Sequence, residues 1–247
     1  MQKKKVLLIP IALILLFSTA CKKCTEVEME DNSEHFSQVE EETSAVYFED
    51  VENNKTLSDW KAINTDVQYL LKIDEREFPV VFNKQDDYYL RKDVWKNYDR
   101  FGTTFLDESS ELDTRNKILY AHSSLTKDIV FNFVENYFGE DAESYYEDHS
   151  TFVLEDDSGE HTYKIYAAYE MNTKEDPWMG WYVPNTDEEF DLVTYLADVL
   201  KNADHVFNGK VSTKAPLLAI ITCNMDTYDF EAKEASNRYI LFAQEVL

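Results

Sequence analysis

Three residues of this chain have side chains that could together perform acyl transfer. Cys223 closes one apolar run, His122 closes another, and Arg238 opens the last apolar run of the sequence. A thiolate can attack a carbonyl carbon, a protonated imidazole can give its proton to a leaving amine, and a guanidinium can stabilise charge on the oxygen. Each of the three residues stands at the boundary of an apolar segment, where a side chain can leave a core. We therefore take Cys223, His122 and Arg238 as candidate catalytic residues.

Each of these residues, taken alone, also has a purely structural explanation. A lone cysteine at the end of a strand is often a small buried hydrophobe, a histidine there is often a hydrogen-bonded cap, and an arginine often pairs with a surface acid. The polar segment Asn224-Met225-Asp226 follows Cys223 at once, which favours exposure of the thiol. The remaining histidines of the domain stand in polar surroundings and are expected to be solvated: His149, His161 and His205.

Motifs for metals and cofactors are missing from the body of the sequence. After residue 56 the sequence has no Cys-x-x-Cys or His-x-x-x-His pair and no glycine-rich phosphate loop. Structural zinc sites and nucleotide sites use such spacings. We therefore expect no metal and no cofactor.

The elements that must position the candidate residues are mainly strands. Eight short runs rich in Val, Ile, Tyr and Phe are bounded by turn residues, a pattern typical of a closed β-barrel. Asp156-Asp157-Ser158-Gly159 predicts a hairpin between two of them. The predicted strands are Phe78–Phe82, Tyr88–Leu90, Thr103–Leu106, Lys117–His122, Thr151–Leu154, Thr162–Glu170, Leu217–Thr222 and Arg238–Val246.

Helices are expected at four places. Leu57–Ile63 and Val67–Ile73 suggest two short N-terminal helices, although the second could instead begin a strand. Asp128–Phe138 has apolar residues at helical spacing and is followed by Gly139, a common helix stop. A capping box at Thr186–Glu189 predicts the start of a longer helix that runs to about Lys201.

The N-terminus predicts export from the cytoplasm. Residues 1–21 combine three lysines, an apolar run and small residues that end at Cys21. This pattern fits either an uncleaved signal-anchor or a lipoprotein-type signal lipidated at Cys21, and both place the rest of the chain outside the membrane. Residues 22–56 then form an acidic, extended tether, with eleven acids and no Lys or Arg between Glu26 and Glu52. The catalytic domain is expected to span residues 57–247.

The overall charge excludes one class of partner. The 247 residues carry 24 Lys and Arg against 49 Asp and Glu, a formal net charge of −25. Nucleic-acid binding requires clustered basic residues that neutralise phosphates. We therefore expect no nucleic acid among the partners.

From Leu57 to Leu247, an ordered set of segments resembles the sortase family, class B in particular. "NKTLSDWKAINTDVQYLLKI" is similar to the N-terminal helices of that family, "FPVVFNKQDDYYLRKD" to its first strands, and "FGTTFLDESS" to the next strand. "RNKILYAHSS" resembles the histidine strand, "AIITCNMD" the Thr-Cys strand and "SNRYILFAQ" the terminal arginine strand. The helix up to Lys201 falls where class B members carry an extra helix before the cysteine strand.

The resemblance implies a fold and an activity. It implies an eight-stranded closed barrel with N-terminal helices, and it implies that His122, Cys223 and Arg238 are the catalytic residues. The implied enzyme is an extracytoplasmic cysteine transpeptidase, held to the membrane by its N-terminal segment. It would cleave the C-terminal sorting motif of exported proteins after Thr and pass the acyl group to an amine of cell-wall precursor or pilin. A thiol hydrolase and a sortase-like surface binding protein without activity remain alternatives.

Two departures from the family pattern lie at the candidate site. Ala121 and Ser123 flank His122, where the family usually has Gly and Asn. The separation of 15 positions between Cys223 and Arg238 is longer than is usual for the class, which predicts a larger loop there.

Overall fold

The computed structural model describes residues 55–73, 76–85, 87–125, 129, 131–175, 177–186, 190–229, 231–232 and 234–247. The predicted export signal at 1–21 lies outside the described residues, and so does the tether at 22–56 except for its last two positions. Within the described part of the chain, no helix is both long enough and apolar enough to cross a membrane.

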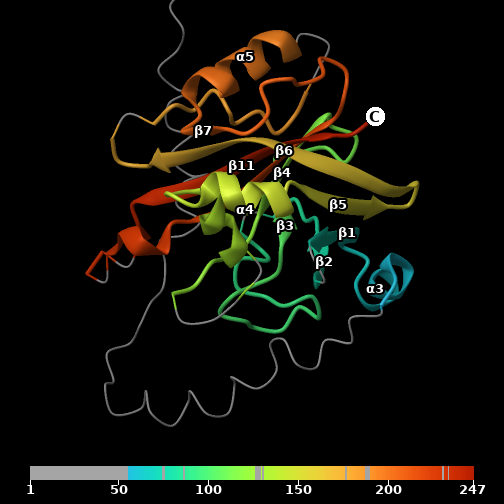
Figure 1. Cartoon of the computed structure of the whole chain (residues 1–247). Helices are drawn as coiled ribbons and strands as arrows, with labels where there is room; N and C mark the ends of the chain where they lie inside the picture. Colours follow the sequence, from blue (N-terminus) through green and yellow to red (C-terminus); the bar gives the residue numbers. More distant parts are fainter. Residues whose placement is uncertain are drawn as a thin grey trace, which may run out of the picture.

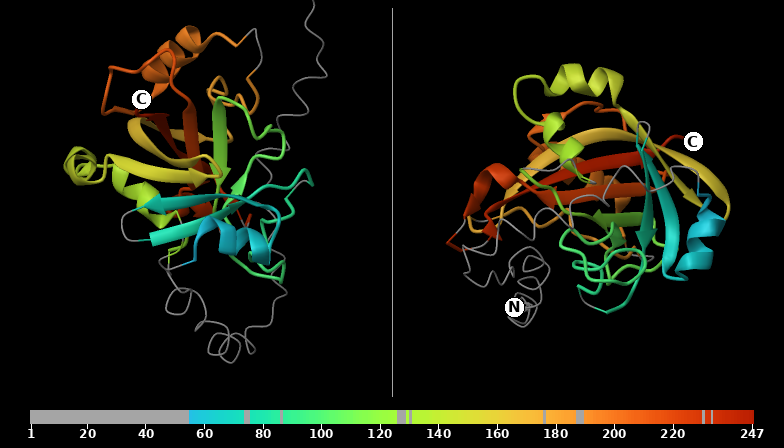
Figure 2. Two further views of the ribbon diagram at one scale, coloured as in Figure 1. Left: turned by 90° about the vertical axis from the view of Figure 1, so that its right-hand side faces the viewer. Right: turned by 90° about the horizontal axis from the view of Figure 1, so that it is seen from below.

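Eight strands form a closed ring, which confirms the mostly β barrel (Figures 1 and 2). The order around the ring is β11-β8-β4-β3-β2-β1-β5-β6, and β6 pairs with β11 to close it. The barrel is mixed, because β4 runs parallel to β8 and β2 parallel to β3. The ring strands are β1 (Val67–Ile73), β2 (Arg76–Val81), β3 (Phe105–Leu106), β4 (Asn116–Tyr120), β5 (Thr151–Asp156), β6 (Gly159–Asn172), β8 (Leu217–Cys223) and β11 (Asn237–Glu245).

Among the described residues, three further strands lie outside the ring. β7 (His205–Val206) extends the sheet beyond β6, and β9 (Tyr228–Asp229) pairs with β10 (Glu234–Ala235) as a small separate ribbon. The hairpin predicted at Asp156–Gly159 is confirmed, since these two residues pair where β5 turns into β6. The turn requires Gly159, whose φ is 131°.

The expected strand at Tyr88–Leu90 is wrong. These residues form a turn in which Leu90 N donates to Asp87 O, while Tyr89 is buried against the cluster around Trp60. The eighth strand of the ring is instead β1, the segment Val67–Ile73, which was expected first as a helix and alternatively as the beginning of a strand. β1 lies between β2 and β5, and all of its residues except Gln68 and Lys72 are buried, so its sequence lacks the strict alternation that identifies half-buried strands.

Helices form near most of the predicted places, but their lengths and types differ from the predictions. α3 (Leu57–Ile63) forms as expected and is capped reciprocally by Thr56 and Asp59. Asn132–Tyr137 is a 3₁₀ helix (η2) rather than an α-helix, although its apolar residues are buried as expected. α4 (Ala142–Asp148) was not expected, because its only buried residue is Ala142 and the segment has no apolar periodicity.

The extra helix before the cysteine strand is present as α5 (Leu192–Asn202), but it begins later than the capping box predicts. Its N-cap is Asp191, whose side chain accepts hydrogen bonds from Val193 N and Thr194 N. Thr186 instead accepts a hydrogen bond from Arg115 N at 3.0 Å and so ties this segment to the start of β4. Residues 187–189 of the capping box lie outside the described residues.

Two apolar clusters lie on opposite faces of the central strands. On β8, Leu218 and Ile220 pack inside the barrel, whereas Ala219 and Ile221 pack outside it with residues of α5 such as Leu196. This alternation follows from the two-residue period of a strand. Both faces of β8 are thus buried, and Cys223 at its end is buried as well, with 7% of its surface exposed, so the expected exposure of the thiol is wrong.

Candidate active site

Strand register brings the three candidate residues to one level of the barrel. Cys223, the last residue of β8, pairs directly with Arg238 at the start of β11. On the other side of β8, Tyr120 of β4 pairs with Ile221. His122 follows Tyr120 by two positions, as Cys223 follows Ile221, so His122 reaches the same level.

The three residues also continue the same face of their strands. Residues of the outer cluster stand two positions away along each strand: Tyr120 on β4, Ile221 on β8 and Ile240 on β11. Because side chains at i and i+2 point to one face of a strand, Cys223 and Arg238 point to the outer face, and His122 follows the same parity just beyond its strand. The structure thus brings together the residues that the sequence singled out.

The histidine segment is fastened to the cysteine strand by side-chain hydrogen bonds. The hydroxyl of Ser123 donates to the carbonyl oxygen of Cys223 at 2.6 Å. The hydroxyl of Thr222 donates in return to the carbonyl oxygen of Ala121 at 2.9 Å. The departure from the family pattern at position 123 therefore has a structural use, because Ser123 holds the residue after His122 against Cys223.

A carboxylate on β6 clamps the cysteine strand to the arginine strand. Glu170 Oε1 accepts hydrogen bonds from Asn224 Nδ2 at 2.6 Å and from Asn237 Nδ2 at 2.7 Å. Asn224 directly follows Cys223, and Asn237 directly precedes Arg238. Glu170 therefore fixes the backbone on which the thiol and the guanidinium stand. A glutamate near the end of a predicted strand gave no sign of this role in the sequence.

His122 lies in a positively charged environment formed by a loop between β2 and β3. Its Nε2 is 2.9 Å from Nη1 of Arg91 and 3.1 Å from the carbonyl oxygen of Leu90. Burial, followed by the positive charge of Arg91, lowers the pKa of His122 to about 4. Arg238 and Arg100 lower the same pKa further, while the contact with Leu90 O raises it. His122 is therefore neutral at pH 7 in this arrangement.

The guanidinium of Arg238 is buried and held by its own turn. Its Nη1 donates to Ala235 O at 2.6 Å and to Asn237 O at 2.9 Å, and the residue is 5% exposed. A fixed, desolvated guanidinium stabilises developing negative charge more strongly than a solvated one. The long separation from Cys223 is filled by the 3₁₀ turn η3 (Met225–Thr227) and the β9–β10 ribbon, which confirms a larger loop there.

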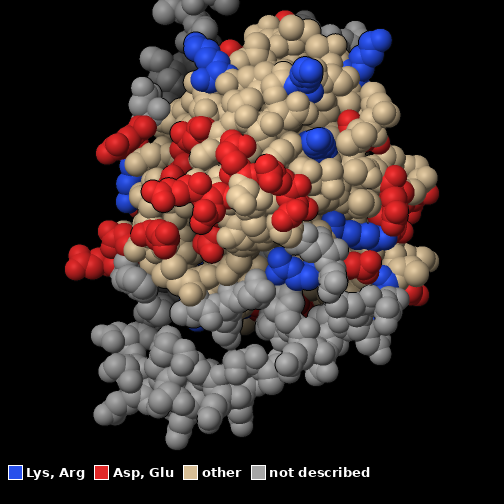
Figure 3. Space-filling view, in the orientation of Figure 1, with Lys and Arg blue, Asp and Glu red and all other residues tan. Residues whose placement is uncertain are grey.

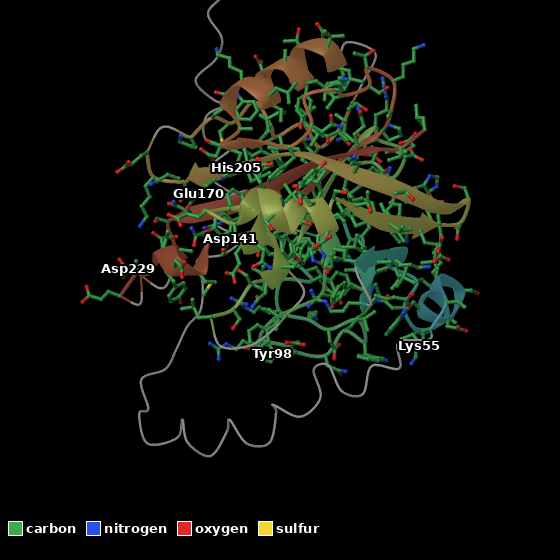
Figure 4. The ribbon with its side chains drawn as sticks, in the orientation of Figure 1. Lys55, Tyr98, Asp141, Glu170, His205 and Asp229 are labelled. Carbon is green, nitrogen blue, oxygen red and sulfur yellow. The ribbon has the colours of Figure 1, made fainter. Side chains whose placement is uncertain are left out.

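The surface beside the site is acidic. Asp and Glu side chains gather on the face that carries α4 and the end of β6 (Figure 3). Asp141, Glu170 and Asp229 lie toward this side of the molecule (Figure 4). Burial and then the charges of Glu170, Asp226 and Glu135 raise the pKa of Tyr239, the neighbour of Arg238, to about 12. Negative charge therefore extends to the edge of the site.

The other histidines of the domain are half-buried and partnered, so the expectation that they are solvated is wrong. His161 Nδ1 is 2.7 Å from Glu245 Oε1, and its Nε2 is 3.3 Å from Asp156 Oδ1. His149 stacks on Tyr145, and His205 stacks on Phe207. These partners are aromatic rings and carboxylates that the polarity of the local sequence does not reveal.

Comparison with known proteins points to one family. The chain is 28% identical over 218 residues to the sortase B of Listeria monocytogenes, across 83% of this chain and 84% of that protein. It is 24% identical over 186 residues to the sortase B of Staphylococcus aureus, across 74% of this chain and 71% of that protein. No family model matches the sequence.

Solved structures share the fold. The X-ray structure of Clostridium perfringens sortase B matches with a TM-score of 0.65 at 23% identity, over 78% of this chain and 100% of that one. A Staphylococcus aureus sortase B–substrate complex matches with a TM-score of 0.63 at 22% identity, over 77% of this chain and 84% of that one. The relatives in sequence, together with the shared barrel fold, support a class B sortase with sortase-type transpeptidase activity.

Proposed function

We propose that this enzyme cleaves a sorting motif after Thr near the C-terminus of exported proteins and transfers the acyl group to an amine of cell-wall precursor or pilin. The observation that carries the proposal is the common level and face of His122, Cys223 and Arg238 at the ends of three adjacent strands. A substrate complex of the related Staphylococcus aureus sortase B supports a peptide as the donor.

In the proposed reaction, the thiolate of Cys223 attacks the carbonyl carbon of the Thr residue, and a C–S bond forms. The C–N bond then breaks, and imidazolium of His122 gives its proton to the departing amine nitrogen. Arg238 stabilises the charge on the carbonyl oxygen in both tetrahedral intermediates. An acceptor amine next attacks the thioacyl carbon, its proton passes to His122, and the thiolate leaves.

The acidic rim favours a cationic acceptor over an anionic one. Glu135, Glu170 and Asp226 act on Tyr239 next to Arg238, and the pKa of Glu135 is raised by burial and by the charge of Asp226. Such a field raises the local concentration of ammonium groups, which supply the attacking amine after losing a proton.

The place of the enzyme in the cell is part of the same proposal. Residues 1–21 anchor the chain to the membrane, residues 22–56 hold the domain away from it, and residues 57–247 work on its outer face. The basic, apolar and small-residue order of the first 21 positions supports this arrangement.

Intact-mass spectrometry tests the reaction directly. Full-length protein in detergent is incubated with a library of Leu-Pro-x-Thr and Asn-Pro-x-Thr peptides, beside the Cys223→Ala variant as control. A thioacyl adduct that needs Cys223, and that is converted to an amide product by an added amine, supports the proposal. Release of free acid at the same rate with and without amine would identify a thiol hydrolase. Peptide binding without an adduct would identify a binding protein.

The pH dependence of the rate tests the proposed ionisation of Cys223 and His122. The reactive form needs a thiolate and an imidazolium together, and a neutral His122 makes this form rare at every pH between the two pKa values. We expect slow turnover that falls below about pH 4 and again above the pKa of the thiol. A rate that stays flat up to about pH 10 would contradict this picture, since an ordinary thiol has a pKa of about 8.5.

A further inference from the structure

The contact between Arg91 and His122 has no role in the proposed reaction. Arg91 belongs to the loop between β2 and β3, and its Nη1 lies 2.9 Å from Nε2 of His122. The same Nη1 donates to the carbonyl oxygen of Arg100 at 2.6 Å, which holds the guanidinium in place. The loop is itself tightly packed at this point, because Gly102 approaches the backbone carbonyls of Tyr89 and Leu90 and has a φ of +61°.

The protonation state of His122 decides which of two partners its Nε2 can use. A guanidinium is always a donor, so Arg91 requires a lone pair on Nε2 and hence a neutral ring with its proton on Nδ1. The carbonyl oxygen of Leu90, 3.1 Å away, is an acceptor and requires a proton on Nε2. One nitrogen cannot satisfy both, so the adjacent residues Leu90 and Arg91 favour opposite forms of the imidazole.

We propose that Arg91 is a positioning residue for His122, which holds the imidazole as the neutral Nδ1–H tautomer and must withdraw before His122 can carry the proton for the leaving amine. The proposal rests on the proposed role of His122 as the acid. Once Arg91 has moved, Leu90 O accepts the new Nε2–H and stabilises the imidazolium. Binding of a substrate that displaces Arg91 would then couple occupancy of the site to formation of the acid.

The charges around His122 support this assignment. Among the described residues, the charged groups that act on it are Arg91 and Arg100 from the β2–β3 loop and Arg238 from the start of β11, and Cys223 ends the neighbouring strand. The three arginines all disfavour an imidazolium. Of the three arginines, Arg91 is the one whose hydrogen bond to the ring nitrogen is described, so it is the arginine that can select the tautomer.

The expected effect on rate follows from the two ionisations. At a pH between the pKa values of His122 and Cys223, the fraction of molecules with both imidazolium and thiolate is set by the difference between these values. Each unit by which the pKa of His122 rises therefore increases the plateau of kcat/KM by about tenfold. The acid limb of the profile moves upward by the same unit.

Two measurements on the full chain test the proposal, with Arg91→Gln as the variant and Arg100→Gln as its control. Arg100→Gln removes a nearby positive charge that does not bond to His122. The ¹⁵N shifts of labelled histidine report the tautomer and the pKa of His122 without any need for activity. We expect Nδ1–H in the parent and in Arg100→Gln, and a higher pKa with loss of this tautomer in Arg91→Gln. The thioacylation plateau of Arg91→Gln should rise by about tenfold for each unit.

The possible outcomes test the role of Arg91 separately from the proposed reaction. An unchanged tautomer and pKa in a folded Arg91→Gln protein would overturn the role of Arg91, even if thioacylation proceeds. An Nε2–H tautomer in the parent would overturn it as well. The expected tautomer change in a protein that forms no thioacyl adduct would support the role of Arg91 at His122 and refute the proposed reaction instead.

Discussion

Removal of the Glu170 carboxylate should loosen the cysteine strand and the arginine strand together. Its Oε1 accepts from the amides of Asn224 and Asn237 at 2.6 and 2.7 Å, and Asn224 is only 5% exposed. A hydrogen bond to a charged group contributes about 1.5–3 kcal/mol, and a buried amide left without its partner costs a comparable amount. Because Glu170 and Asn237 are partly exposed, we expect Glu170→Ala to lower the free energy of unfolding by about 2–4 kcal/mol.

Thermal unfolding followed by circular dichroism measures this loss. For a domain of this size, about 2–4 °C of Tm corresponds to 1 kcal/mol, so Tm should fall by roughly 5–15 °C. Glu170→Gln keeps an oxygen acceptor but loses the charge, so about half of the effect is expected. Glu175→Gln is the matched control, because Glu175 follows shortly after on the same segment and is exposed.

The activity of the same variants separates positioning from general stability. A misplacement of reacting groups by about 1 Å can cost a factor of about 100 in rate. We therefore expect thioacylation by Glu170→Ala, measured well below its Tm, to fall by roughly one to two orders of magnitude. A Glu170→Ala protein with the Tm of Glu175→Gln and the thioacylation rate of the parent would show that Glu170 does not hold the two strands together.

Three further changes have expected outcomes that follow from single contacts. Ser123→Ala removes the hydroxyl that donates to Cys223 O, and we expect a loss of about 0.5–1.5 kcal/mol in urea unfolding together with slower thioacylation; unchanged stability and rate would show that this bond is dispensable. Gly102→Ala would place a Cβ 2.4 Å from Tyr89 O at a φ of +61°, so a loss of at least 1–3 kcal/mol is expected, roughly the cost of such backbone strain; a Tm equal to that of the parent would contradict it. His161 has a pKa raised first by its hydrogen bond to Glu245, so its contribution to stability is full below its unfolded pKa of about 6.5 and is lost as the pH rises through the folded value. The Tm difference between the parent and His161→Gln should therefore be larger at pH 6 than at pH 9, and the opposite order would show that the sign is wrong.

Local sequence patterns determined most of the strands and the candidate residues. Runs of β-branched and aromatic residues located β2, β4, β5, β6, β8 and β11, because a strand in a barrel must bury such side chains. Cys223 and Arg238 could be singled out because each stands at the boundary of such a run. Where apolar residues did not alternate, as in β1, the pattern could not distinguish a strand from a helix.

Only the tertiary structure decided how these elements meet. The pairing of Cys223 with Arg238 and the level of His122 depend on register, which is fixed by contacts between strands far apart in the sequence. The same holds for the Glu170 clamp and for Arg91 at His122, because a charged residue in a strand or loop has no local signature of the partner it will find. Sequence by itself thus determined which residues could do chemistry, and the closure of the barrel decided which of them act on one another and in what state of charge.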